Sequence, residues 1–170
     1  MGVSMASTDA IKEAFEGYAE EDRLLGPHAL QALTWASVVC GLLAYAARSG
    51  RLEDRVSAAD VALLGITTHK ISRIVTRTEV MNFLRAPFTK YEGPANLNEV
   101  NQQPKGEGLS RAVGELVACP LCIGTWIAGG LMCGLAFAPR FTRAIETTFA
   151  GVAISDLLHV LYAEAIERAS

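Results

Sequence analysis

The sequence has few charged and few aromatic residues. Of its 170 residues, 19% are charged and 7% are aromatic, whereas an average soluble domain has roughly 25% charged residues. Four cysteines are too few for a disulfide-rich scaffold, and a net charge of −3 argues against a nucleic-acid partner. The first 27 residues carry six acids against two cations, the wrong sign for a secretory signal. Apolar types make up 51%, which excludes a disordered chain and indicates lipid or an unusually buried core.

Two uncharged segments of 19 residues each, 29–47 and 120–138, dominate the hydropathy pattern, and arginine follows both of them. At 1.5 Å per residue, each would form a helix of roughly 28 Å, about the thickness of the hydrocarbon core of a bilayer. We therefore predict that both segments are transmembrane helices. The alternative is a pair of buried core helices in a soluble all-α domain.

Two further segments are weaker candidates for crossing the membrane. Segment 58–76 begins with a short apolar run and ends in cations, and segment 144–163 contains Glu146, Asp156 and His159. Acidic groups at membrane depth normally face a helix bundle. If both segments cross, ten Lys and Arg residues lie on one side and five on the other, and the positive-inside rule places the ten in the cytoplasm.

The predicted fold is all-α: a small helical bundle with three to four transmembrane helices in a bacterial cell membrane, with both termini cytoplasmic. Residues 1–27 are expected to form an acidic amphipathic helix, because apolar residues recur at helical spacing from Ile11 to Tyr18. Residues 28–170 form the membrane domain. It contains a long loop at about 85–108, rich in proline, glycine and amide side chains, and loops of this length are usually functional or disordered.

The most distinctive local motif is Cys119-Pro120-Leu121-Cys122. Proline after the first cysteine makes Cys119 a natural N-cap, and the positive end of a helix lowers the pKa of a thiol. The same spacing supplies half of a zinc site, for which His69, His159 or Glu115 are the available partners. Structural packing of two small residues, a metal site and a redox pair all remain open.

Asp156 and His159 are three residues apart and therefore share one face of the predicted last helix. One interpretation is an ion pair or hydrogen bond buried in the bundle. The other is a proton relay, or a metal ligand with a supporting carboxylate. Gly130 and Gly134 form a G-x-x-x-G pattern, which suits close helix packing within the bundle or in a homo-oligomer.

Several short stretches form a pattern that extends over roughly residues 30–165. They are Thr68-His69-Lys70-Ile71-Ser72-Arg73, Leu84-Arg85-Ala86-Pro87-Phe88-Thr89-Lys90-Tyr91-Glu92-Gly93, Glu99-Val100, Pro104-Lys105-Gly106, Arg111-Ala112-Val113-Gly114-Glu115-Leu116, Cys119-Pro120-Leu121-Cys122-Ile123-Gly124-Thr125-Trp126 and Ser155-Asp156-Leu157-Leu158-His159. In these stretches the chain resembles the YjcA-like family of small bacterial membrane proteins, a family of unknown function with some members labelled sporulation proteins. The resemblance implies an integral membrane protein and supplies no reaction, cofactor or catalytic residue.

The first functional hypothesis is a non-enzymatic scaffold or recruitment protein. The loop bearing Arg85, Lys90, Tyr91 and Lys105 would dock anionic lipid headgroups or an acidic partner, and the acidic segment 1–27 would meet a soluble protein in the cytoplasm. This hypothesis involves no catalytic residue, no cofactor and no nucleic acid.

The alternative is a membrane thiol-redox or metal-binding protein. Its candidate residues are Cys119, Cys122, His69, His159 and Asp156, with zinc or another transition metal as the cofactor in the metal version. Because the predicted topology places the cysteine pair in the reducing cytoplasm, a stable disulfide is not expected there.

Overall fold

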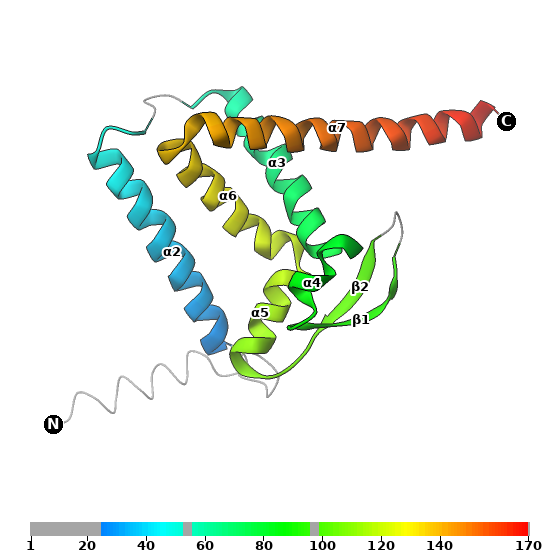
Figure 1. Cartoon of the computed structure of the whole chain (residues 1–170), viewed down its shortest axis with the longest axis horizontal. Coiled ribbons are helices and arrows are strands. Elements are labelled where there is room, and N and C mark those ends of the chain that lie inside the picture. The colour runs from blue at the N-terminus through cyan, green and yellow to red at the C-terminus, as the bar shows by residue number, and fades with distance from the viewer. Residues whose placement is uncertain (1–24, 53–55, 96–98, 170) are drawn as a thin grey trace.

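The computed structural model describes residues 25–52, 56–95 and 99–169, and most of the acidic segment 1–27 lies outside this range. Four long helices and one small helix-and-hairpin unit make up the described chain (Figure 1). The long helices are α2 (Leu25–Arg48), α3 (Ala58–Arg77), α6 (Pro120–Phe137) and α7 (Pro139–Ala169).

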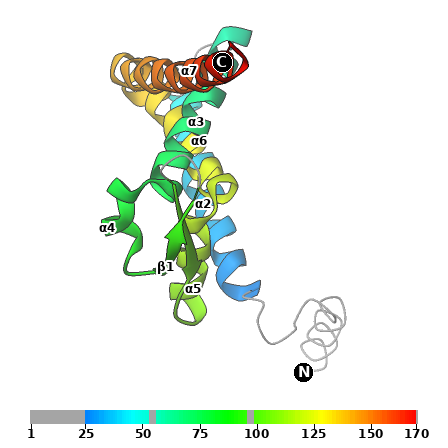
Figure 2. The ribbon, with the colours of Figure 1, turned by 90° about the vertical axis from the view of Figure 1, so that its right-hand side faces the viewer.

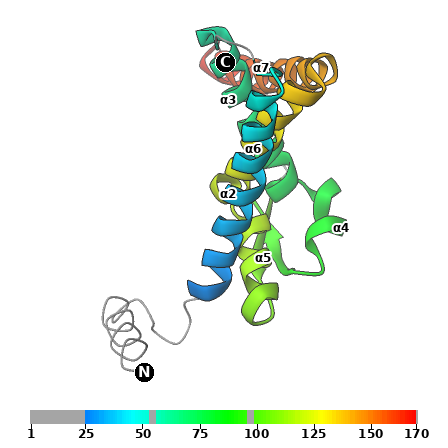
Figure 3. The ribbon, with the colours of Figure 1, turned by 90° about the vertical axis from the view of Figure 1, so that its left-hand side faces the viewer.

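Helices α2, α3 and α6 run alongside one another, and α7 crosses one end of this group (Figures 1, 2 and 3). Ala138 is the single residue between α6 and α7, so the chain reverses sharply there. The first turns of α7 pack on α3 and α6, where Thr67 of α3 donates a hydrogen bond to the carbonyl oxygen of Glu146. From Ile154 onward every described residue of α7 is exposed, and this half extends beyond the other helices (Figure 1).

Residues 79–118 form a compact unit at the opposite end, which we call the hairpin module. Its elements are η1 (Glu79–Met81), α4 (Asn82–Arg85), β1 (Thr89–Pro94), β2 (Val100–Pro104) and α5 (Gly108–Ala118). The strands pair antiparallel from Thr89 opposite Pro104 to Pro94 opposite Val100, with a register shift after Tyr91. The prediction of an all-α chain is therefore wrong in this region, because the expected loop at 85–108 contains a β-hairpin.

Helix α5 packs closely against the hairpin, and Gly114 permits this approach. A Cβ atom at Gly114 would lie 2.5 Å from the carbonyl oxygen of Phe88 and 3.1 Å from the Cβ of Pro104. Glycine is needed here for space, since no larger side chain fits without moving backbone.

Three helices are long and apolar enough to cross a membrane by length and composition, and they are the only ones among the described residues: α2, α6 and α7. They contain the predicted segments 29–47, most of 120–138, and 144–163, which confirms these helices. Helix α3 has the length but carries more charge along its C-terminal half, and it does not meet the same criterion.

The helix contacts are made by small and hydroxyl-bearing residues, while large apolar side chains point outward. Buried positions include Ala46, Ala136 and Ala150, together with Thr67 and Thr76 of α3. A Cβ at Gly129 would lie 2.8 Å from Val39 of α2, and one at Gly134 would lie 2.6 Å from Thr142 of α7. Leucine, valine and isoleucine side chains are exposed along α2 and α7, including Leu30, Leu33, Val38, Leu42, Leu157, Leu158 and Leu161.

Candidate functional site

The two cysteines of the C-x-x-C motif begin α6, as the proline between them predicts. Cys119 is the N-cap, Pro120 opens the helix, and the backbone N–H of Cys122 donates to the Sγ of Cys119 over 3.2 Å. The two sulfur atoms are joined in a disulfide, with the Cα atoms 5.2 Å apart. The expectation that this pair would not be joined is therefore corrected. Cys122 is exposed, so the pair is accessible to a thiol partner.

His69, His159 and Asp156 do not join the cysteine pair. They line a separate cavity of about 670 Å³ between α3 and α7, which we call the α3–α7 cavity. Among residues 25–52, 56–95 and 99–169, no three His, Cys, Asp or Glu residues are grouped so as to hold a metal ion. The structure therefore does not assemble the metal site that the sequence suggested as an alternative.

Asp156 and His159 lie on one helix face, but not inside a bundle as expected. The Asp156 side chain is 55% exposed and forms an ion pair with the Nζ of Lys70 on α3. A second ion pair in the same cavity joins Arg73 of α3 to Glu99, with 3.0 Å between Nε and Oε1. The α3–α7 cavity thus contains two cation–carboxylate pairs and two histidines.

Arg85 is a structural residue of the hairpin module rather than part of a docking surface. Its side chain is 1% exposed. Nη2 donates to the carbonyl oxygen of Thr78 (2.8 Å) and to Oδ1 of Asn82 (2.5 Å). Nη1 donates to the carbonyl oxygen of Val75 (2.5 Å), and Nε donates to Oε1 of Gln102 (3.0 Å). These contacts join α3, η1, α4 and β2 through one guanidinium group.

Burial also lowers the pKa of the Arg85 guanidinium, and the nearby charge of Arg77 acts in the same direction. A guanidinium stays protonated in proteins, so Arg85 keeps its charge and all of its donors. The prediction that Arg85 contacts lipid headgroups or an acidic partner is wrong, because the residue is buried and all three of its nitrogens already donate to groups of the protein.

The other three loop residues do lie at the surface. Lys90 and Lys105 are exposed, and the Tyr91 side chain is 55% exposed. Lys105 also donates from Nζ to the carbonyl oxygen of Ala86 over 2.6 Å, which fixes its position next to α4. We call the exposed residues Lys90, Tyr91 and Lys105 the hairpin surface; Lys90 and Tyr91 are consecutive in β1, so their side chains lie on opposite sides of the strand.

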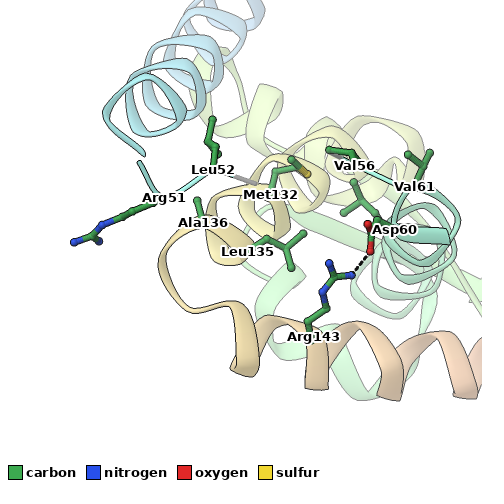
Figure 4. Close-up of a pocket in the computed structure, with 10 residues that line it drawn as sticks. Arg51, Leu52, Val56, Asp60, Val61, Met132, Leu135, Ala136 and Arg143 are labelled. Carbon is green, nitrogen blue, oxygen red and sulfur yellow. Dashed lines mark hydrogen bonds and ion pairs between the residues drawn. The ribbon is translucent and has the colours of Figure 1, made fainter. Parts of the chain in front are cut away.

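A smaller cavity, of about 240 Å³, lies where α2 ends and α7 begins (Figure 4). Its lining is mostly apolar, and the polar contact within it is the ion pair between Asp60 and Arg143, 2.5 Å from Oδ1 to Nη1 (Figure 4). Asp60 also belongs to a capping box: its backbone N–H donates to Ser57 Oγ, and its carboxylate accepts from the backbone N–H of Ser57. The acid in segment 58–76 is thus a helix-start residue.

Glu146 lies next to this pair and is 1% exposed. Neither of its carboxylate oxygens accepts a hydrogen bond from the described residues, and its nearest ion-pair partner is Arg143 at 3.9 Å. In the sequence, Glu146 is recognisable only as an acid that should face a helix bundle. The Ser57-x-x-Asp60 spacing, by contrast, is a readable signal for the start of α3 that was not used in the prediction of this helix.

The comparisons with known proteins assign the chain to a family. Residues 63–162 match the family model described as Protein of unknown function (DUF1360). The chain is also 25% identical over 116 residues to the Sporulation protein YjcA of Bacillus subtilis (strain 168), an alignment covering 66% of this chain and 98% of that protein. No solved structure matches. The family match includes most of α3, the hairpin module, α6 and most of α7, and the chain therefore belongs to the DUF1360 family of proteins of unknown function.

Proposed function

We propose that this chain is an integral membrane protein that holds the hairpin module at one membrane surface as a docking platform. The side chains are distributed in the opposite way to those of a soluble protein, and this distribution supports the membrane location. Small and hydroxyl residues make the helix contacts, and leucine-rich faces of α2 and α7 point outward. Water would penalise such an exposed apolar surface, whereas lipid tails would not.

The proposed topology has four crossings, with both termini and the hairpin module in the cytoplasm. Helix α3 would be the fourth crossing: its Thr67, Ser72 and Thr76 are buried, while Val61 and Ile66 are exposed. Lys and Arg number ten on the module side and five on the other, which favours this orientation. Reporter fusions after residue 52 and after residue 170 should give opposite sidedness. The same sidedness for both would show that one of α3 and α7 does not cross; α7 is the helix that lies across the ends of the others (Figures 1 and 2).

The observation that carries the docking function is the rigid anchoring of the hairpin by Arg85. One buried guanidinium ties the hairpin to α3, so the hairpin surface is presented in a fixed position at the end of the helices. A preformed platform loses little conformational entropy on binding. Its two exposed cations, Lys90 and Lys105, suit an acidic protein segment.

A photo-crosslinking amino acid at position 91 tests the docking function in intact cells. We expect crosslinks at Tyr91 to protein bands of discrete mass, and their loss in a Lys90→Glu, Lys105→Glu background. The matched control is the same amino acid at Tyr162, which is 69% exposed on α7 and should crosslink to lipid. Crosslinks that are identical at both positions, or unaffected by charge reversal, would contradict a docking platform.

A second candidate function is thiol–disulfide exchange by Cys119 and Cys122. The bonded and accessible pair at the start of α6 favours it. In that reaction two thiols lose two protons and two electrons to a partner disulfide, which becomes two thiols. Thiol alkylation of cells at rest measures the state of the pair, and Cys40→Ser, Cys133→Ser removes the other two cysteines as a background. A Cys122→Ser variant should then trap a mixed disulfide through Cys119 if exchange occurs.

A further inference from the structure

The α3–α7 cavity has an unusual balance of charge. Lys70 and Arg73 come from α3, and their partners Asp156 and Glu99 come from α7 and from the residue before β2. Two formal positive and two formal negative charges face one volume of about 670 Å³. A simple anion would meet two carboxylates there, and a simple cation would meet an ammonium and a guanidinium. A ligand that carries both signs can satisfy both sets of groups.

An apolar surface continues from this charged cavity. On α7, Leu158, Leu161 and Tyr162 lie next to His159, which lines the cavity. The two leucines and the tyrosine are exposed on the C-terminal half of α7. A charged volume adjoining an apolar surface matches an amphiphile, whose polar head and hydrocarbon tail need these two environments side by side.

We propose that the α3–α7 cavity binds a phospholipid whose headgroup combines a phosphate with a primary ammonium, as in phosphatidylethanolamine. On binding, the Lys70–Asp156 and Arg73–Glu99 pairs exchange partners: Lys70 and Arg73 bind the phosphate, and Asp156 and Glu99 accept hydrogen bonds from the ammonium. An acyl chain lies against the exposed apolar side chains of α7, such as Leu158 and Leu161. The inference rests on the membrane location proposed above and is independent of the hairpin surface. It involves binding alone, with no bond made or broken.

The chemistry of the carboxylates defines which headgroup is preferred. A primary ammonium has three N–H donors, whereas a quaternary ammonium has none and a glycerol headgroup carries no positive charge. Charge-assisted hydrogen bonds are roughly twice as strong as neutral ones. Phosphatidylethanolamine should therefore bind more tightly than phosphatidylcholine or phosphatidylglycerol with the same acyl chains.

Native mass spectrometry of the full chain in detergent, titrated with these three lipids, tests the proposal on the unaltered protein. We expect phosphatidylethanolamine to bind about tenfold more tightly than the other two, the size of one well-placed charged hydrogen bond. Equal binding of all three would overturn the proposal. Glycerophosphoethanolamine, the same headgroup without acyl chains, separates the two sources of this chemistry: equal affinity for it would overturn the assignment to a lipid.

Variants locate the binding. Asp156→Asn should remove the preference for phosphatidylethanolamine, and Arg73→Gln should weaken binding of all three lipids. Arg168→Gln is the matched control, because its ion pair with Glu164 lies on the same helix outside the cavity. A preference retained in Asp156→Asn would overturn the site. Fractionation after an alkaline wash tests the membrane location separately: a protein that stays with the membrane but shows no headgroup preference refutes this inference alone.

Discussion

Arg85 and Glu146 are both charged, both 1% exposed, and surrounded in opposite ways. Arg85 donates to two side chains and two backbone carbonyls in the hairpin module and α3. Glu146, where α7 meets α3, has two carboxylate oxygens that accept no hydrogen bond from the described residues. A buried charge whose hydrogen bonds are complete holds elements together, whereas one without them costs free energy that the rest of the fold must offset.

The two ends of the molecule differ accordingly. The hairpin module is joined to α3 by directional contacts that allow one arrangement. The contact of α7 with α3 uses small residues, one buried hydrogen bond from Thr67 to the carbonyl oxygen of Glu146, and two partly exposed ion pairs, Asp60–Arg143 and Lys70–Asp156. We infer that solvent screens the charged contacts of α7 more than it screens those of Arg85 in the module.

Arg85→Met should have the largest effect. Methionine keeps most of the side-chain length but removes the four hydrogen bonds that the buried guanidinium donates, so we expect a loss of about 3–5 kcal/mol in unfolding free energy. Thermal unfolding in detergent, with limited proteolysis across residues 86–107, measures it. The control is Lys90→Met, an exposed lysine in the same hairpin, which should change stability by less than about 0.5 kcal/mol. Equal stability of the two variants would remove the structural role of Arg85.

Gly114→Ala disturbs the same end of the molecule, the hairpin module, by steric overlap and not by the loss of a charge. The new methyl group would lie 2.5 Å from the carbonyl oxygen of Phe88, so α5 or the hairpin must shift, at a cost of about 1–3 kcal/mol. The matched control is Gly130→Ala, since nothing lies within 4 Å of a Cβ there. We expect that substitution to be neutral or slightly stabilising in the same unfolding measurement.

Glu146→Gln tests the second buried charge. It should increase the free energy of unfolding, whereas Arg85→Met decreases it. Glutamine keeps the shape and removes the charge, so we expect a gain of about 1 kcal/mol because a charge whose oxygens accept no hydrogen bond is no longer buried. Glu164→Gln, at an exposed position of the same helix, should change stability by less than about 0.5 kcal/mol. A marked loss in Glu146→Gln would mean that the carboxylate binds a partner in the folded protein.

The smallest effect is expected at an exposed pair. Nε2 of His28 lies 2.7 Å from Oε2 of Glu115, and both side chains are partly exposed. A double-mutant cycle with His28→Gln and Glu115→Gln should give a coupling energy below about 1 kcal/mol, because solvent screens the pair. A larger coupling energy would show that this contact is as strong as the buried hydrogen bonds of the hairpin module.

The long helices were predictable because long uncharged runs are rare in soluble proteins, whose helices do not need them. The Cys119 N-cap was predictable from the proline that follows it, and the contact between Arg111 and Glu115 from their spacing, since both depend on local sequence alone. The hairpin was not predictable, because its strands are rich in glycine, proline and amide residues and show no alternation of apolar and polar types.

The surroundings of charged residues were also beyond prediction. Arg85 was assigned to the surface because arginine is rarely buried, and its partners are mostly backbone or amide groups that carry no charge signal. Lys70 and Asp156 are 86 residues apart in the chain. Their contact depends on how α7 crosses α3, which no local pattern in either segment determines.

The contact between His28 and Glu115 fixes where the first described residues of the chain lie. It holds the start of α2 beside α5, at the end that carries the hairpin module (Figures 1 and 3). Helix α5 in turn packs against the hairpin at Gly114. A change in the tilt of α2 would therefore move α5, and the hairpin with it, so the orientation of the first helix and the position of the hairpin module are mechanically coupled.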